Sequence, residues 1–159
     1  MEPRACKDLA GRCGMYCGAC EIHRAYADGG KVRIDVAKKH NCLPADVRCK
    51  GCRAVHVIGW SRSEDWGRNC AILNCLKRRG IETCHDCTSI LSCDRWLALH
   101  GECYAKGIDL KANLIAVSRQ GPDAFVQEMD KRWRCQHCGK PIAASADDNR
   151  CHHCGQFNL

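Results

Sequence analysis

The sequence has few aromatic residues and no long apolar run. Only 6% of its 159 residues are aromatic, with two Phe and three Tyr among them, so a large aromatic core is not expected. No stretch approaches the ~18–20 apolar residues that a membrane span needs, and we expect no membrane segment.

Sequence signatures of common catalytic sites are also missing. We find no P-loop, dinucleotide-binding fingerprint, Ser/His/Asp set or pair of carboxylates placed for acid–base chemistry. His23, Asp28 and His85 could lie near a metal, but a lone polar residue there usually supports a ligand rather than reacting. We therefore predict no catalytic residues, and the sequence favours a protein without enzymatic activity.

Cysteine, in contrast, is abundant, with 17 residues. The start of the chain, Met1-Glu2-Pro3-Arg4, lacks the positive-then-apolar pattern of a secretory leader, and we expect a cytoplasmic protein. In that compartment paired thiols indicate metal ligands or redox groups rather than structural disulfides. An odd number of cysteines also cannot close entirely into intramolecular disulfides.

The formal net charge of +7 counts every cysteine as neutral. Four thiolates around Zn²⁺, or around a [4Fe–4S]²⁺ cluster, carry a net charge of about −2. Basic runs such as Lys77–Arg79 can therefore compensate metal–thiolate centres. This interpretation weakens the case for nucleic-acid binding, which rests on the same charges.

The end of the chain carries two CxxCG motifs, and they predict a zinc ribbon. Two residues between thiols let both sulfur atoms reach one ion from a single turn, and the following glycine permits a positive φ. The predicted ligands are Cys135, Cys138, Cys151 and Cys154. Four thiolates fill a tetrahedral shell, so the zinc should be structural. We expect a hairpin turn at residues 147–149 and exposed, non-ligating His137, His152 and His153.

Ten further cysteines form two groups of five, which predict two more metal centres. In the first group, two CxxC pairs make the simplest closed shell, Cys17, Cys20, Cys49 and Cys52, and leave Cys13 over. In the second group we predict Cys75, Cys84, Cys87 and Cys93 as ligands, with Cys70 left over. The missing Cys-Pro ending of ferredoxins favours zinc, whereas the CxxxCxxC run and the spare thiols suit a [4Fe–4S] cluster equally well.

The segments between the cysteines predict a mostly α, metal-stapled domain over residues 1–133, followed by a short β zinc ribbon over residues 134–159. One strand is expected, at Val55–Ile58. Apolar spacing and capping signals predict helices over residues 16–27, 32–40, 61–79, 89–100, 108–117 and 122–129.

The pattern resembles the DUF3795 family of cysteine-rich bacterial and archaeal proteins. The resemblance rests on the CGMYCGAC run from Cys13 to Cys20, on Cys49-Lys50-Gly51-Cys52, and on Cys70 and Cys75 followed by KRRGIETCHDC, with Cys93 beyond it. It implies a cytoplasmic metal-binding protein and no particular reaction.

Two functions remain open at this stage. The first is a binding or regulatory adaptor with structural tetrathiolate sites and a protein partner, since ribbons commonly dock protein or nucleic acid. The second is an iron–sulfur protein for electron transfer or redox sensing, favoured by the surplus thiols.

Overall fold

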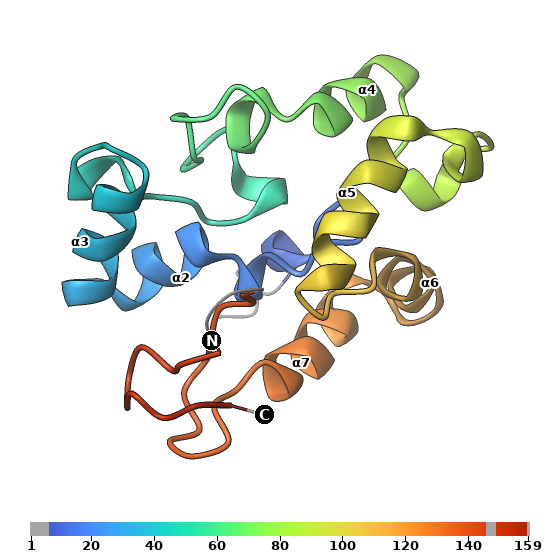
Figure 1. The fold of residues 1–159 in the computed structure, drawn as a ribbon. Coiled ribbons are helices and arrows are strands. Elements are labelled where there is room, and N and C mark those ends of the chain that lie inside the picture. The colour runs from blue at the N-terminus through green and yellow to red at the C-terminus, as the bar shows by residue number, and fades with distance from the viewer. Residues whose placement is uncertain (1–6, 146–148, 159) are drawn as a thin grey trace.

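The computed structural model describes residues 7–145 and 149–158, and over these residues the chain is mostly helical, as predicted (Figure 1). Short 3-10 turns connect the longer helices. The α-helices are α2 (Glu21–Asp28), α3 (Gly30–Lys39), α4 (Ala71–Arg79), α5 (Asp94–Ala105), α6 (Leu110–Gln120) and α7 (Pro122–Arg132). None of the described helices is long and apolar enough to cross a membrane.

Helices α2 and α3 form one side of the molecule (Figure 1). Gly29 adopts a φ of 64°, which lets the chain turn directly from α2 into α3. The apolar faces of both helices pack on Trp60, which is 5% exposed. This core consists of Ile22, Ala25, Val36, Ala37, Val47 and Trp60.

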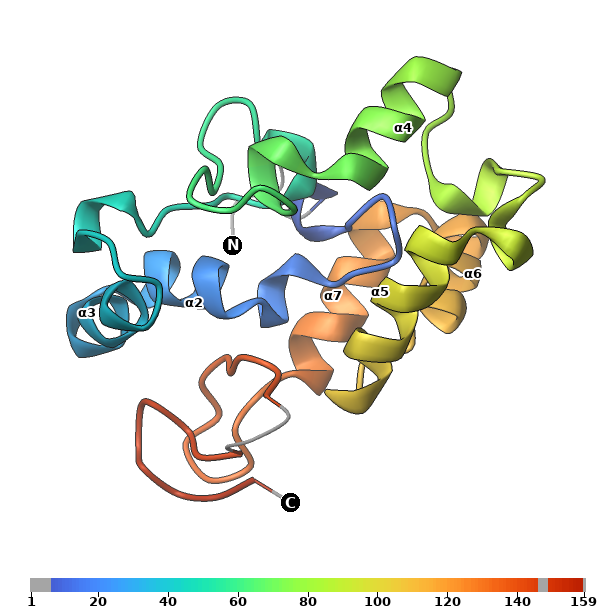
Figure 2. The same cartoon turned by 45° about the horizontal axis from the view of Figure 1, so that its top comes forward.

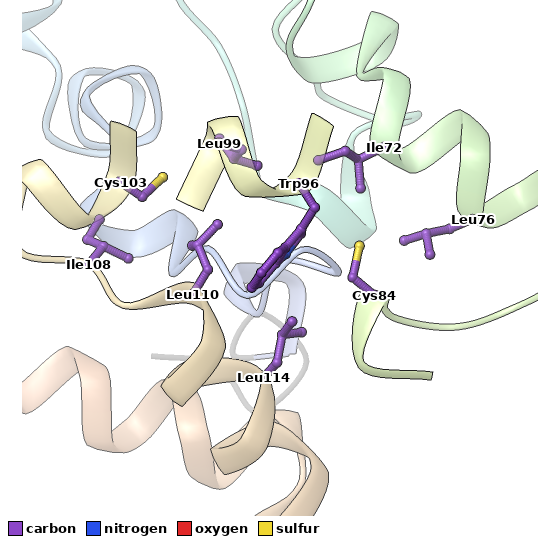
Figure 3. Packing of buried hydrophobic residues seen from close by; sticks show 9 residues of the cluster. All are labelled: Ile72, Leu76, Cys84, Trp96, Leu99, Cys103, Ile108, Leu110 and Leu114. Atoms are coloured by element: carbon purple, nitrogen blue, oxygen red, sulfur yellow. The ribbon is translucent and has the colours of Figure 1, made fainter. Parts of the chain in front are cut away.

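A second core lies where α4, α5 and α6 meet (Figure 3). Its centre is Trp96 of α5, which is 2% exposed and whose indole Nε1 donates a hydrogen bond to the Cys13 carbonyl at 2.9 Å. The buried members are Ile72, Leu76, Cys84, Trp96, Leu99, Cys103, Ile108, Leu110 and Leu114. Two of them are cysteines, so thiols are part of the apolar core.

Helix α7 packs on the segment that precedes α2. The rings of Tyr16 and Phe125 meet edge to face, with centroids 6.3 Å apart. Figures 1 and 2 both show this segment running between the α2–α3 pair and helices α5 to α7. Residues 13–20, which carry the first three cysteines of the described chain, therefore lie in the middle of the molecule.

The predicted strand at Val55–Ile58 is wrong. A 3-10 helix, Cys52–Ala54, leads into a turn in which the N–H groups of Val57 and Ile58 both donate to the Ala54 carbonyl. Val57 is 75% exposed while Val55 is buried, so the run of apolar residues reflects a tight turn with one inward side chain.

The helix predicted over residues 61–79 covers only Ala71–Arg79. The Ser63 hydroxyl accepts from the N–H groups of Asp65 and Trp66, which is a local turn that competes with a helix. Gly67 then adopts a φ of 65°, and a Cβ at this position would lie 2.0 Å from the Trp60 carbonyl oxygen. Similarly, 3-10 turns replace the predicted first turns of α2 and α5.

Candidate metal centres

The two CxxCG motifs fold into matching turns. In each turn, the N–H two residues after the first cysteine donates to its sulfur, from His137 to Cys135 and from His153 to Cys151, both at 3.4 Å. Gly139 and Gly155 adopt φ values of 71° and 75°. Each of the two glycine N–H groups donates to the carbonyl of the first cysteine of its motif, at 2.9 and 2.8 Å. These are the positions at which the sequence analysis expected a positive φ.

The matching extends beyond the cysteines. Arg134 and Arg150, which precede the two motifs, each donate from Nη1 to the carbonyl of the glycine that ends the motif. An antiparallel bridge closes each turn, from Arg134 to Pro141 and from Arg150 to Phe157. In this region the described residues hold only these isolated bridges and no extended strand, so the short β ribbon that the sequence predicts is not shown. The turn predicted at residues 147–149 lies mostly outside the described residues.

The four sulfur atoms of these turns converge. The Sγ atoms of Cys135 and Cys154 are 3.7 Å apart, and those of Cys138 and Cys151 are 3.8 Å apart. A tetrahedron with metal–sulfur bonds of about 2.3 Å has edges of about 3.8 Å, so these thiols already have the spacing of ligands to a single ion. All four ligand atoms lie within 4.8 Å of one another.

Electrostatics at this site favour a bound cation. Burial opposes ionisation of Cys135, but N–H groups of Cys138 and His137 and the thiols of Cys151 and Cys154 donate to its sulfur, lowering its pKa to about 6. Burial and the sulfur atoms of Cys135 and Cys138 raise the pKa of Cys151 to about 11. Negative charge on one sulfur atom therefore opposes ionisation of its neighbours, and a bound cation would offset this repulsion.

The C-terminal segment contacts α2 through a second group of polar side chains. His152 Nε2 lies 2.7 Å from Asp28 Oδ2, and His153 Nε2 lies 3.4 Å from the same oxygen. These three ligand atoms also lie within 4.8 Å of one another. However, His153 Nε2 is 3.1 Å from the Pro141 carbonyl, which can only accept a hydrogen bond. The contacts therefore hold the C-terminal turns against α2, next to the hydrogen bond from Ala144 N–H to the Ala19 carbonyl at 2.8 Å.

The second N-terminal group of thiols surrounds a cavity. A void of about 40 Å³ between α4 and α5 is lined by Cys75, Cys84, Cys87 and Cys93, which are the four ligands predicted from the second group. Cys70, the one left over, is not part of the lining. Burial and the neighbouring thiols of Cys93, Cys87 and Cys75 raise the pKa of Cys84 to about 12, in order of decreasing effect.

Two arginines also lie at the cavity, and the cysteine motifs did not predict them as part of this site. Arg79 and Arg95 line it, and Arg79 Nη1 donates to Cys87 Sγ at 3.6 Å. The basic run Lys77–Arg79 was the signal for Arg79 in the sequence.

The remaining N-terminal thiols lie near one another in the centre of the molecule. Burial raises the pKa of Cys17, with further increases from Cys52, Cys20 and Cys49, the other predicted members of its set. Burial also raises the pKa of Cys13, which lies near Cys52. Cys13 has Cys70 and Cys84 as further neighbours, so it links the two groups of thiols.

An ion-pair network holds these thiol-bearing segments together. Arg12 Nη1 lies 2.6 Å from a Glu82 carboxylate oxygen, and Arg53 pairs with the other oxygen. Each of these three residues lies close to a cysteine in the sequence. Arg12 precedes Cys13, Arg53 follows Cys52, and Glu82 lies two positions before Cys84. The Cys84 N–H also donates to the Arg12 carbonyl at 2.9 Å. Glu82 thus joins three distant parts of the chain around the central thiols.

The predicted cysteine ligands differ in how closely their sulfur atoms approach one another. In the part of the chain that the structure describes, only the C-terminal four cysteines and the Asp28–His152–His153 group bring three or more ligand atoms within 4.8 Å of one another. The N-terminal thiols are neighbours at longer range. All 16 described cysteines are free thiols.

Among known proteins, no curated protein and no solved structure matches the chain. A family pattern matches residues 9–98, a segment that contains all ten N-terminal thiols of the two groups and ends within α5. The C-terminal turns lie outside that match. Because the match spans more than half of the chain, the chain belongs to the family described as "Protein of unknown function (DUF3795)".

Proposed function

We propose that this protein is a non-enzymatic, cytoplasmic metalloprotein that serves as a binding or regulatory adaptor. Its helical unit, residues 1–133, would hold two metal centres, and the unit formed by residues 134–159 would hold one zinc ion. The observation that carries the proposal is the sulfur spacing of 3.7–3.8 Å among the C-terminal cysteines, which fits a zinc tetrahedron.

The zinc would have a structural role. Cys135, Cys138, Cys151 and Cys154 supply four ligands, and a tetrahedral zinc ion with four protein ligands has no open position for substrate or water. The turns contribute few apolar contacts of their own, so the metal would provide much of the free energy that orders them. The free thiols of the chain suit a reducing compartment.

A substitution in one knuckle tests this role. The full-length chain should bind zinc at the C-terminal site, and Cys138→Ser should lose about one zinc ion per chain because one of four ligands is gone. His137→Ala is the matched control. It removes the neighbouring side chain but keeps the backbone N–H that donates to Cys135. Unchanged zinc content in Cys138→Ser would contradict the ligand assignment.

A basic groove supports nucleic acid as a second class of partner. The side chains of Lys77, Arg78 and Arg95 line a hollow of about 440 Å³ beside α4, together with Asn69 and Asn74. Its lining includes no acidic residue. Binding of a DNA or RNA duplex that weakens steeply with salt, and more weakly in Arg78→Ala, would support this partner, since each phosphate contact releases a counterion. No binding at low salt would contradict nucleic acid as the partner.

A further inference from the structure

We propose that the cavity between α4 and α5 binds a [4Fe–4S] cluster through Cys75, Cys84, Cys87 and Cys93. The inference rests on the proposed function, because it takes this part of the chain to bind metal. It goes further by naming the cofactor and by separating this centre chemically from the C-terminal one.

The four thiols come from three elements that surround one void. Cys75 lies within α4, Cys84 and Cys87 lie at a 3-10 turn that begins at Cys84, and Cys93 precedes the first residue of α5. The Thr83 N–H and hydroxyl both donate to Asp86 Oδ2 at 3.1 Å, which fixes that turn. Figure 3 shows Cys84 between Leu76 of α4 and Trp96 of α5. The thiols are thus positioned by packed elements rather than by a flexible loop.

The spacing of the sulfur atoms favours a cluster over a single ion. In the C-terminal turns two pairs of sulfur atoms are 3.7 and 3.8 Å apart, close to the edge of a tetrahedron around zinc, and all four lie within 4.8 Å of one another. In the cavity, no three of the four sulfur atoms lie within 4.8 Å of one another. A cubane cluster places iron and sulfide ions between its thiolates, so its ligands stand further apart than those of one ion.

The cavity also has room for more than one atom. Its volume is about 40 Å³, whereas one water molecule needs ~10–15 Å³ by the same kind of measure. Apolar side chains form the rest of its wall, among them Ile72, Leu76, Ile81, Ile90 and Trp96.

Two cations balance the charge that the cluster would bring. A [4Fe–4S]²⁺ cluster with four thiolates carries about −2, and Arg79 and Arg95 line the same wall. Arg79 donates to the sulfur of Cys87, and such a bond stabilises a thiolate ligand and tunes the reduction potential of a cluster. Zinc would bring the same net charge, so the discriminating observations are the sulfur spacing and the void.

Cys84→Ser and Cys103→Ala make a matched pair of variants. Cys84 and Cys103 belong to the same core and are 7% and 8% exposed, but Cys103 does not line the cavity. The full-length chain is produced and purified without oxygen, and its iron, acid-labile sulfide and zinc are measured. We expect Cys84→Ser to lose about four iron and four sulfide ions per chain, together with absorbance near about 400 nm. We expect Cys103→Ala to keep both.

The zinc content separates failure of this proposal from failure of the proposed function. Zinc in the cavity, lost in Cys84→Ser while no iron is found, would overturn the cluster and leave a metal-binding protein. A full-length chain that contains only its C-terminal zinc, and takes up no iron when given iron and sulfide, would overturn both the cluster and the second metal centre.

A measurement on the unmodified chain covers the case in which Cys84→Ser does not fold. X-ray absorption at the iron edge should show sulfur neighbours and iron–iron scattering, and Arg79→Gln should shift the reduction potential of the cluster without loss of iron. Iron without iron–iron scattering would contradict a cluster.

Discussion

In the C-terminal turns each pair of thiols comes from a single turn of the backbone, whereas the cavity between α4 and α5 draws its four thiols from three packed elements. The first site is therefore specified by two local motifs, each of four consecutive residues. The second exists only when helices, turn and core are assembled. Short-range geometry produces sulfur atoms 3.7–3.8 Å apart, and tertiary packing produces wider spacing around a void.

The same contrast applies to what stabilises each region. The helical part has three buried apolar clusters, built around Trp96, Phe125 and Trp60. The C-terminal turns add two buried cysteines, Cys135 and Cys151, and most of their other side chains are exposed or half-buried. Metal should therefore supply a larger share of the folding free energy in the turns than in the helical part.

Complete metal removal should have the largest effect on this comparison. Structural zinc contributes about 10–16 kcal/mol to small thiolate sites, so a strong chelator under reducing conditions should unfold the C-terminal turns. We expect the helical part to unfold as well, since the proposed metal centres would join its thiol-bearing segments. Far-UV circular dichroism before and after chelation, and after metal is restored, measures this. Helical signal that survives complete removal would show that the three apolar clusters suffice.

Gly14→Ala should disturb the central thiols and leave the C-terminal site intact. Gly14 lies between Cys13 and Cys17 with a φ of 99°, and a Cβ there would lie 2.3 Å from the Leu110 carbonyl oxygen of α6. We expect a loss of about 2–4 kcal/mol in the free energy of unfolding, because both the backbone and the packing are strained. Denaturant unfolding of the full chain measures the change.

Gly121→Ala is the control for that substitution. Gly121 has a similar φ of 85°, but nothing lies within 4 Å of the position of its Cβ. It should therefore cost only the backbone strain, about 1–3 kcal/mol, since its ψ of 163° places it in a region essentially restricted to glycine. Equal losses in both variants would mean that the close approach of Gly14 to α6 does not matter.

Local patterns could be predicted from the sequence, and contacts between distant residues could not. The CxxCG turns and the helices α3, α6 and α7 follow from spacing within short segments. Cys75, Cys84, Cys87 and Cys93, which the sequence groups together, line one cavity, and their role as ligands stays a prediction. The contact between His152 and Asp28 joins residues 124 positions apart, and no sequence pattern signals it. The run at Val55–Ile58 misled for a similar reason, since only the packing of Val55 beneath an exposed Val57 shows that the chain turns there.

Asn113→Ala tests how firmly the thiol-bearing segment is held on α6. Asn113 is 7% exposed, and its Nδ2 donates to the Gly14 carbonyl at 2.8 Å. Its removal leaves a buried acceptor without this donor, which should cost about 1–3 kcal/mol in unfolding free energy. Asn74→Ala, at an exposed position of α4, should change stability by less than about 0.5 kcal/mol. If both variants unfold at the same denaturant concentration, the bond from Asn113 does not stabilise the segment.

Asp28→Asn should have the smallest effect, and it addresses the connection between the two regions. Asp28 accepts from His152 at 2.7 Å, and the two side chains are 17% and 21% exposed. Partly exposed ion pairs contribute about 0.2–1 kcal/mol, so global stability should change by no more than that.

The change should be local, because the pair joins α2 to the C-terminal turns while each part keeps its own core or metal ligands. Hydrogen exchange should therefore speed up at residues 150–155 and stay unchanged in α5 and α6. Asp35→Asn, which removes an exposed carboxylate of α3 that pairs with Lys31, should leave exchange at residues 150–155 unaltered. Equal exchange in Asp28→Asn and the unmodified chain would mean that the hydrogen bond from Ala144 to Ala19 holds the turns against α2 without the ion pair.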